Sequence, residues 1–267
     1  MRFGSPVKQG RCASRGRAPC LRTLRNLNFT NFDNPMAGMK MMNTSSRNLA
    51  ACLFTFACTL FLLPTVLVAQ EKTPTHPHVS YGPEERQWLN LYLPSGDKPA
   101  PVFIYAHHNG STADDVKSSW ANPTLVEGTA IVSWESIAQV KGLHDFKTCT
   151  ADAKVMFEWV KKNAATYNFD VNKIIIGGQS RGSFVSWELA HSRDASIVGI
   201  YMGQALPGRS FNERLLEPIT KKAPPIFLAY RKEPGVVEDI HDPAHGLRVL
   251  GRYRKLGIGD KAELVHS

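Results

Sequence analysis

The stretch Lys173-Ile-Ile-Ile-Gly-Gly-Gln-Ser-Arg-Gly182 joins a run of isoleucines to a glycine-rich turn, and a segment with helical spacing follows it. The isoleucines predict a buried strand. The turn contains the pattern Gly-x-Ser-x-Gly, in which a tight strand-to-helix connection lifts the Ser180 hydroxyl above the edge of the sheet. Glycines on both sides of the serine avoid Cβ clashes, and the helix N-terminus favours developing negative charge. In this setting the pattern predicts a nucleophilic serine.

Apolar runs and helical segments alternate on both sides of this turn. The expected strands lie at 88–93, 101–106, 130–134, 173–177, 197–202, 225–230 and 262–265. The expected helices lie at 150–168, 183–191 and 245–256. Strands that alternate with helices indicate parallel βαβ units. The predicted fold class is therefore α/β, a mostly parallel sheet flanked by helices in one domain at residues 85–267.

The basic residues are concentrated before this domain. The chain of 267 residues has a net charge of +9, yet residues 1–69 hold nine Lys and Arg and one acidic residue. The remainder holds 23 basic and 22 acidic residues, and no stripe of Lys and Arg with interleaved aromatics. The charge of the domain thus gives no reason to expect a nucleic-acid partner.

Residues 1–69 are expected to be a leader. An uncharged apolar stretch at 49–69 follows Lys40 and Arg47 and ends at the small residue Ala69. This order is typical of a secretory signal peptide cleaved after Ala69, and it predicts a secreted or periplasmic protein. The alternative is an uncleaved anchor, the one case in which we expect membrane association. Residues 70–84 are expected to form a polar linker.

The cysteines and histidines indicate neither a disulfide nor a metal site. Four of the five cysteines lie in the leader, so Cys149 is the single cysteine of the expected mature chain. An exported domain with one cysteine has no internal disulfide and must rely on its core. No Cys/His cluster has the spacing of zinc ligands, and we expect no metal and no other cofactor.

Several motifs follow one another in the order found in a known family. They are Leu89-Asn-Leu-Tyr-Leu-Pro94, Pro101-Val-Phe-Ile-Tyr-Ala-His-His-Asn-Gly110, Phe169-Asp-Val-Asn-Lys-Ile174 and the Gly-Gly-Gln-Ser-Arg-Gly turn. Over roughly residues 85–267 the chain resembles the esterase/lipase branch of the α/β-hydrolase fold. The resemblance implies a serine hydrolase that cleaves small or polysaccharide-linked carboxylic esters through an acyl-enzyme on Ser180. The alternative hypothesis is a non-catalytic binding protein with this fold.

The resemblance also places an oxyanion hole. In the family, a His-Gly loop after the third strand supplies one amide, and here 107–110 occupies that place, with His108 where glycine is usual. The expected donors are the backbone N–H groups of Asn109 and Arg181. His107 is expected to stiffen the loop. The Arg181 side chain opposes the helix macrodipole, so it should pair with a carboxylate or bind an anionic substrate group.

The acid and the base of the expected triad are open choices. The acid follows the strand that ends at Tyr230, and Glu233 and Asp239 are the two candidates, with Glu238 and Asp242 expected to be solvated. The family histidine lies beyond the last strand, where His266 is the one histidine left. His266 is therefore the first candidate for the base, ahead of His241 and His245. A further interpretation is that the chain is truncated at its C-terminus and lacks the family histidine.

Overall fold

The computed structural model describes residues 70–207, 215–231, 234 and 240–266. In this part of the chain eight strands form one sheet in the order β1-β2-β4-β3-β5-β6-β7-β8. The strands are β1 (His76–Ser80), β2 (Trp88–Tyr92), β3 (Ala100–Ala106), β4 (Ala130–Trp134), β5 (Phe169–Gln179), β6 (Ile197–Gly203), β7 (Ile226–Tyr230) and β8 (Ala262–His266). The first two pairings are antiparallel and those from β4 to β8 are parallel.

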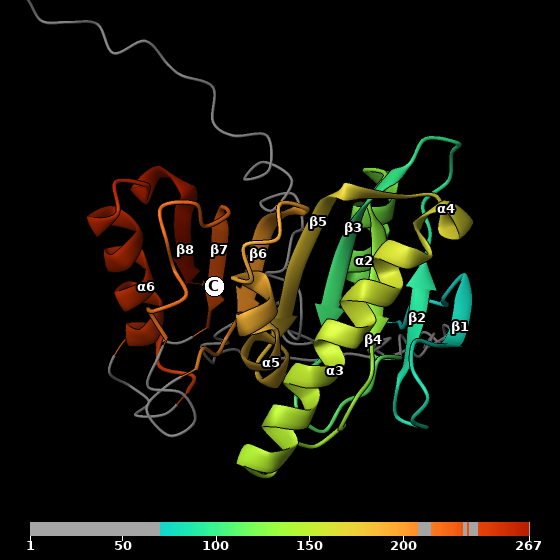
Figure 1. Ribbon diagram of the computed structural model, residues 1–267, viewed down its shortest axis with the longest axis horizontal. Coiled ribbons are helices and arrows are strands. Elements are labelled where there is room, and N and C mark those ends of the chain that lie inside the picture. Colours follow the sequence, from blue (N-terminus) through green and yellow to red (C-terminus); the bar gives the residue numbers. More distant parts are fainter. Residues whose placement is uncertain (1–69, 208–214, 232–233, 235–239, 267) are drawn as a thin grey trace, which may run out of the picture.

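Helices cover both faces of the sheet. They are α2 (Ser118–Val126), α3 (Leu143–Lys162), α4 (Ala164–Tyr167), α5 (Arg181–Ala190) and α6 (Pro243–Lys255), with a short 3-10 helix at Gly259–Lys261. In Figure 1, α3, α5 and α6 lie in front of the sheet and α2 lies behind it. The prediction of an α/β fold with a mostly parallel, helix-flanked sheet is confirmed.

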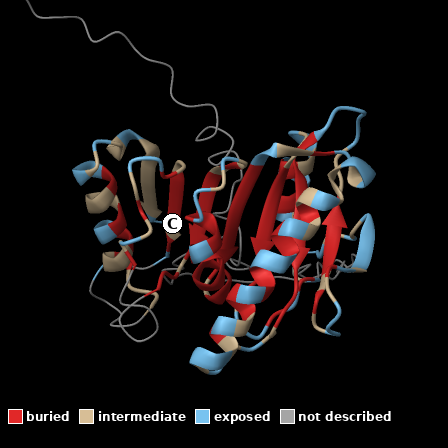
Figure 2. Ribbon diagram, viewed as in Figure 1, coloured by how far each residue is buried: buried red, intermediate tan, exposed pale blue. Residues whose placement is uncertain are grey.

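The core lies on the two faces of the sheet. Every residue of β4 is buried, and the central strands are buried along almost their whole length (Figure 2). Because helices cover both faces, these strands read as continuous apolar runs rather than alternating ones. The carboxyl ends of β3 to β8 lie at one edge of the sheet, and the loops that follow them meet there.

The structure differs from the prediction at the N-terminal edge of the sheet. Within 70–84, the segment expected to be a polar linker, His76–Ser80 forms β1 and pairs with β2. As an edge strand, β1 is mostly exposed, so it lacks the apolar alternation that would have identified it. The helix α2 was not predicted either, because Pro123 interrupts its sequence.

The helix α3 begins at Leu143, before the expected start at Thr150. Thr150 and Asp152 are buried in its interior, and Asp145 is the acidic residue of its first turn. The Asp152 carboxylate accepts hydrogen bonds from Arg86 Nε at 2.9 Å and from Gln87 Nε2 at 2.7 Å. Asp152, a residue type common at helix starts, therefore serves a buried tertiary contact, and the Thr150 hydroxyl donates to the Phe146 carbonyl within the helix at 3.0 Å.

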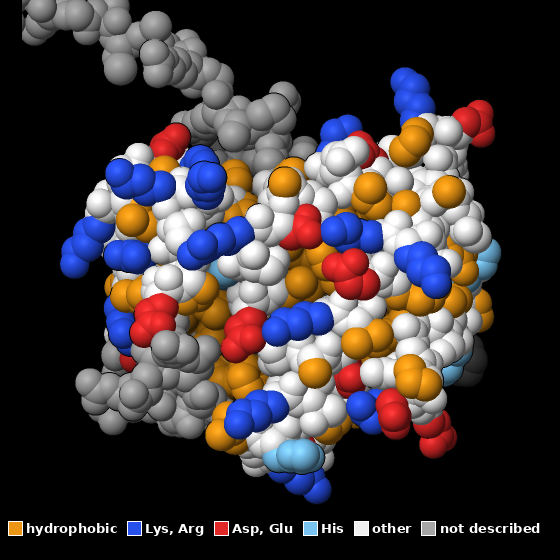
Figure 3. Space-filling view, viewed as in Figure 1, with side chains coloured by type: hydrophobic (Ala, Val, Ile, Leu, Met, Phe, Trp, Pro, Cys, Tyr) orange, Lys and Arg blue, Asp and Glu red, His pale blue; other side chains and the backbone are white. Residues whose placement is uncertain are grey.

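The front face carries charges of both signs. Figure 3 shows Lys and Arg side chains gathered over α6, whose last turn contains Arg252, Arg254 and Lys255. Elsewhere on this face Asp and Glu are interspersed with the cations. Within the described ranges, no helix combines the length and apolar character needed to cross a bilayer.

Candidate active site

Ser180 sits at a sharp turn between β5 and α5, residues 179–182, which we call the elbow. Its backbone has φ 50° and ψ −118°, a conformation that is costly for a residue with a side chain. Its N–H donates to the Gly203 carbonyl at 2.7 Å, and this bond ties the elbow to the neighbouring strand. The strained backbone turns the hydroxyl out at the carboxyl edge of the sheet, as the Gly-x-Ser-x-Gly pattern predicts.

Gly182, two residues after the serine, allows two backbone segments to approach closely. A Cβ at Gly182 would lie 1.9 Å from the Ala106 carbonyl oxygen and 2.7 Å from that of His107. The first turn of α5 is thereby packed directly against the end of β3 and the loop that follows it. Any side chain at this position would push the elbow away from the predicted oxyanion loop.

The imidazole of His241 lies beside the nucleophile. Ser180 Oγ and His241 Nε2 are 2.9 Å apart, a hydrogen-bond distance. His241 directly precedes the N-cap of α6, where the Asp242 side chain accepts a hydrogen bond from the Ala244 N–H at 2.8 Å. The Ile240 carbonyl accepts from the Leu206 N–H at 3.1 Å, which links this loop to the one after β6. At this distance the imidazole could accept the hydroxyl proton.

The structure favours His241 over His266, the first candidate from the sequence. His266 ends β8, where it pairs in register with Tyr230. β8 is three strand positions from β5, which at the usual strand spacing is about 14 Å, too far for its imidazole to reach Ser180. His241, by contrast, has its Nε2 2.9 Å from Ser180 Oγ. His245 lies in the first turn of α6.

A signal for His241 was present in the sequence. Asp242 followed by Pro243 is a helix start, because aspartate is a favoured N-cap and proline a favoured first helical residue. That start leaves His241 in the loop at the carboxyl end of a parallel strand, the edge at which Ser180 was expected. The two candidate acids, Glu233 and Asp239, lie outside the described residues, as does Glu238.

Asn109 lies in the loop after β3, which is hydrogen-bonded to the loop after β4. Its side chain accepts from the Val140 N–H at 2.7 Å and donates to the Val140 carbonyl at 3.3 Å. The adjacent Gly110 N–H donates to the Ala138 carbonyl at 3.0 Å. Arg181 is the first residue of α5. The two predicted oxyanion donors therefore stand on segments that meet beside the elbow.

The Arg181 side chain turns inward and is 6% exposed. Its guanidinium donates to the Ile137 carbonyl and lies 3.6 Å from Cys149 Sγ. One terminal nitrogen lies 2.7 Å from Nε2 and 3.1 Å from Nδ1 of His107. Burial lowers the pKa of the guanidinium. The sequence suggests that Arg181 pairs with a carboxylate or binds an anionic substrate group. These contacts are internal to the protein, and the Glu135 carboxylate contacts the same His107 ring as Arg181 does.

His107 is fully buried between this guanidinium and a carboxylate. Its Nε2 lies 2.9 Å from Glu135 Oε1. Burial lowers the pKa of the imidazole, and the hydrogen bond to Glu135 opposes that shift only in part. The expected role of His107, to stiffen the loop, agrees with these contacts.

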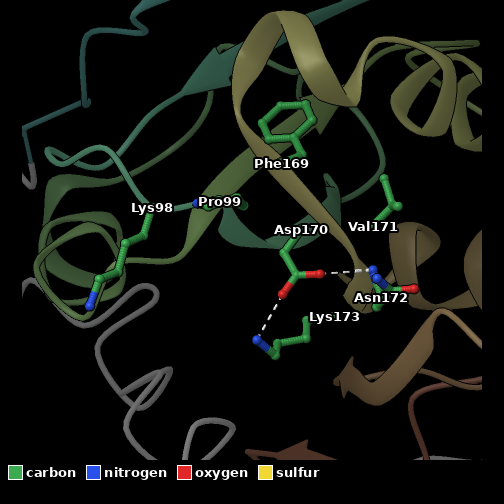
Figure 4. A pocket seen from close by; sticks show the side chains of 7 residues that line it. All are labelled: Lys98, Pro99, Phe169, Asp170, Val171, Asn172 and Lys173. Carbon is green, nitrogen blue, oxygen red and sulfur yellow. Dashed lines mark hydrogen bonds and ion pairs between the residues drawn. The ribbon is translucent and has the colours of Figure 1, made fainter.

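Figure 4 shows a hollow at the amino end of β5, opposite the carboxyl end that carries Ser180. It is lined by Lys98, Pro99, Phe169, Asp170, Val171, Asn172 and Lys173. Asp170 bonds the Lys173 ammonium at 2.7 Å and the Asn172 N–H at 3.1 Å, so its charge is satisfied internally. Lys98 and Pro99 precede β3 and the other five residues begin β5, whereas Ser180 follows the end of β5. Among the described residues, no group of three or more His, Cys, Asp or Glu could hold a metal ion.

The sequence model of the BD-FAE family matches residues 89–233 of the chain. This range contains the elbow and the loops after β3 and β4, and it ends before His241. No curated protein matches the chain.

Several solved structures share the fold. A truncated form of a carbohydrate esterase from gut microbiota has a TM-score of 0.56 at 18% identity, over 74% of this chain and 88% of that one. Propionate-bound esterase Est2 of Thermogutta terrifontis has a TM-score of 0.54 at 14% identity, over 71% and 82%. A bifunctional GH43-CE protein of Bacteroides eggerthii has a TM-score of 0.53 at 16% identity, over 70% and 34%. At these identities the matches establish the fold.

Proposed function

Because the chain belongs to the BD-FAE family of carbohydrate esterases, we propose that it hydrolyses carboxylic esters through an acyl-enzyme on Ser180. The observation that carries this proposal is the 2.9 Å hydrogen bond between Ser180 Oγ and His241 Nε2 at a strained elbow. A serine hydroxyl is a weak nucleophile by itself, and an imidazole at this distance can accept its proton as it attacks.

The reaction follows from the positions of these groups. Ser180 Oγ attacks the ester carbonyl carbon while His241 Nε2 takes the hydroxyl proton. The carbonyl oxygen becomes an oxyanion, which the N–H groups of Asn109 and Arg181 would stabilise, each contributing about 3 kcal/mol. His241 then returns the proton to the departing alkoxide, and the alcohol leaves. A water, deprotonated by the same imidazole, releases the acid and restores Ser180.

A carboxylate is needed to orient His241 and to stabilise its protonated form. We propose Glu233 or Asp239 for this role, since both follow β7 within the segment that leads to His241. Replacing each by alanine distinguishes them: loss of the rate in one variant alone identifies the acid, and unchanged rates in both exclude the two candidates.

We propose that the natural substrates are acyl groups linked to polysaccharides. The family and two of the structural neighbours, the carbohydrate esterase from gut microbiota and the bifunctional GH43-CE protein, support this class of substrate. Export would bring the enzyme to such polymers, and we propose that the leader directs export with cleavage after Ala69. N-terminal sequencing of the mature protein should begin at Gln70; an N-terminus upstream of 49–69 would contradict cleavage.

The test of the activity is ester hydrolysis by the wild-type protein and the Ser180→Ala variant, with an aryl acetate and an acetylated xylan as substrates. We expect wild-type turnover and a loss of at least about 10³-fold in the variant. Ser192→Ala, which changes an exposed serine just beyond α5, is the matched control and should keep the wild-type rate. A folded wild-type protein that binds acetylated xylan without turnover would instead support the non-catalytic alternative.

A further inference from the structure

The oxyanion side of the site is built by two loops that are bonded to each other. The loop after β4, residues 135–140, bonds Asn109 and Gly110 at one end. At its other end Glu135 Oε2 accepts from the Ala113 N–H at 3.2 Å, and Oε1 accepts from the Ser136 N–H at 2.9 Å. The loop after β3 is therefore held on both sides of the Asn109 amide, the first proposed oxyanion donor.

The second donor is connected to the same loops by its own side chain. Arg181 contributes its backbone N–H to the proposed oxyanion hole and sends its guanidinium to the Ile137 carbonyl and the His107 ring. His107 begins the loop that carries Asn109, and Ile137 lies in the middle of the loop after β4. One side chain thus contacts both loops from the residue next to the nucleophile.

The contact between Arg181 and His107 is made over the face of the ring. A donor cannot lie in the ring plane within hydrogen-bond distance of both nitrogens, because Cε1 occupies the space between them. The guanidinium nitrogen, at 2.7 and 3.1 Å from the two nitrogens, therefore lies above the ring. Glu135 Oε1 lies 2.9 Å from Nε2 and the His108 carbonyl oxygen lies 2.9 Å from Nδ1, so each ring nitrogen has an acceptor beside it. Arginine is suited to this stacked arrangement.

The cluster contains opposite charges on its two outer members. Glu135 is 4% exposed and Arg181 is 6% exposed, and the His107 imidazole lies between them. A buried charge without a partner would be strongly unfavourable, whereas here the carboxylate has three donors and the cation has a carbonyl and a ring face. The cost of placing a cation at the N-terminus of α5, against the helix macrodipole, is offset by these contacts.

We propose that the side chain of Arg181 is a positioning residue, which fixes the distance between the two oxyanion donors by binding His107 and Ile137. The proposal rests on the esterase function above and adds a residue whose side chain makes no contact with substrate. It acts through the placement of two backbone amides, so its effect falls on the transition state, where the oxyanion forms.

The test compares Arg181→Met, which keeps side-chain bulk and the backbone N–H, with Arg181→Lys, which keeps the charge and a donor for Ile137. For an aryl acetate we expect kcat to fall about 10- to 100-fold in Arg181→Met, less in Arg181→Lys, with KM within twofold of wild type in both. The rate of phosphonylation of Ser180 by a fluorophosphonate should fall by the same factor, because the phosphoryl oxygen would occupy the same hole.

The control is Lys161→Met, which removes an ion pair with Asp194 at 2.9 Å far from the elbow. It should lower the unfolding temperature slightly and leave kcat unchanged. Should Arg181→Met fail to fold, Arg181→Lys and His107→Gln decide the question. His107→Gln keeps a donor for Glu135 and removes the ring face, and its kcat should also fall at constant KM.

The outcomes separate this inference from the proposed function. Ser180-dependent turnover in the wild-type protein, with an unchanged kcat and a lower unfolding temperature in the Arg181 variants, would overturn the positioning role alone. An increase in KM with constant kcat would overturn it as well, because that result assigns Arg181 to substrate binding. A folded wild-type protein without Ser180-dependent turnover would overturn the proposed function, and this inference with it.

Discussion

The two sides of Ser180 are held in different ways. Toward β3 and β4, buried contacts of His107 with Glu135 and Arg181, together with exposed hydrogen bonds at Asn109, fix the loops that carry the proposed oxyanion donors. Toward β7, the contacts around His241 include its bond to Ser180, the Leu206–Ile240 backbone bond and the Asp242 cap. Substitutions on the first side should therefore change stability and rate together, whereas the loss of the His241 imidazole on the second side should mainly change the rate.

The largest effect should come from the base side, with His241→Ala. Without the imidazole the Ser180 hydroxyl has no proton acceptor, and we expect kcat to fall by at least about 10³-fold. The unfolding temperature should change little, since His241 is half-buried in a loop. Steady-state kinetics and thermal melts measure both quantities.

His266→Ala is the matched control for this prediction, because it removes the other candidate histidine from the end of β8. We expect its kcat to stay within twofold of wild type. The assignment of the base would be reversed if His266→Ala lost activity and His241→Ala kept it.

On the oxyanion side, Gly182→Ala should lower both activity and stability. The new methyl group would lie 1.9 Å from the Ala106 carbonyl oxygen. To relieve this clash the backbone itself would have to move, which is energetically costly. We expect a loss of about 2 kcal/mol or more in the free energy of unfolding and a fall in kcat of tenfold or more. Gly251→Ala, at a helical position with open space around it, should be neutral or slightly stabilising. Equal behaviour of the two variants would contradict the close approach.

A buried histidine beyond the end of α5 should make the stability of the protein depend on pH. Burial lowers the pKa of His191, which follows α5, from 6.5 to about 4. As the pH falls from 6.5 to about 4, the unfolded chain therefore binds a proton that the folded chain does not, and the free energy of unfolding should fall by up to about 3 kcal/mol.

His191→Gln tests this prediction, because glutamine does not titrate and can still donate to the Trp187 carbonyl, which lies 3.0 Å from His191 Nδ1. Denaturant unfolding at pH 7, 5 and 4 should show a weaker loss of stability in the variant than in wild type. The exposed His144→Gln is the control and should retain the wild-type slope. Parallel curves for wild type and His191→Gln would rule out His191 as the source.

The smallest effect should come from Asp242→Ala, which removes the N-cap of α6 behind His241. Loss of the hydrogen bond to the Ala244 N–H should lower the free energy of unfolding by about 1 kcal/mol. The rate should fall a few-fold, because the helix start helps to place His241. Asp242→Asn retains a capping oxygen and should restore most of both quantities. A loss in Asp242→Asn equal to that in Asp242→Ala would show that the cap is not the cause.

The elbow and the parallel strands could be predicted from the sequence because their signals are local. The isoleucines of β5 and the glycines around Ser180 specify a buried strand and a close backbone approach without reference to distant residues. β1 could not be predicted in this way, because an exposed edge strand needs no apolar pattern. The start of α3 at Leu143 could not be predicted either, because Thr150 and Asp152 have the residue types of a helix start but make buried contacts inside the helix.

The side chains around Ser180 could be predicted only in part. The loop that carries Asn109 and a loop-stiffening role for His107 are expected from the sequence, whereas the burial of His107 and its pairing with Glu135 depend on residues that meet only in the fold. The family resemblance favours His266 as the base, because the family histidine lies after the last strand. The contact of His241 with Ser180 forms only in the fold, in which β8, the strand that His266 ends, lies three positions from β5.

The central claim is that Ser180 is an activated nucleophile, and the most direct measurement is mass spectrometry of the wild-type protein after exposure to a fluorophosphonate. We predict one adduct per chain, mapped to the peptide that contains Ser180, and none in Ser180→Ala. A folded wild-type protein that carries no adduct, or that carries it on another residue, would contradict the account.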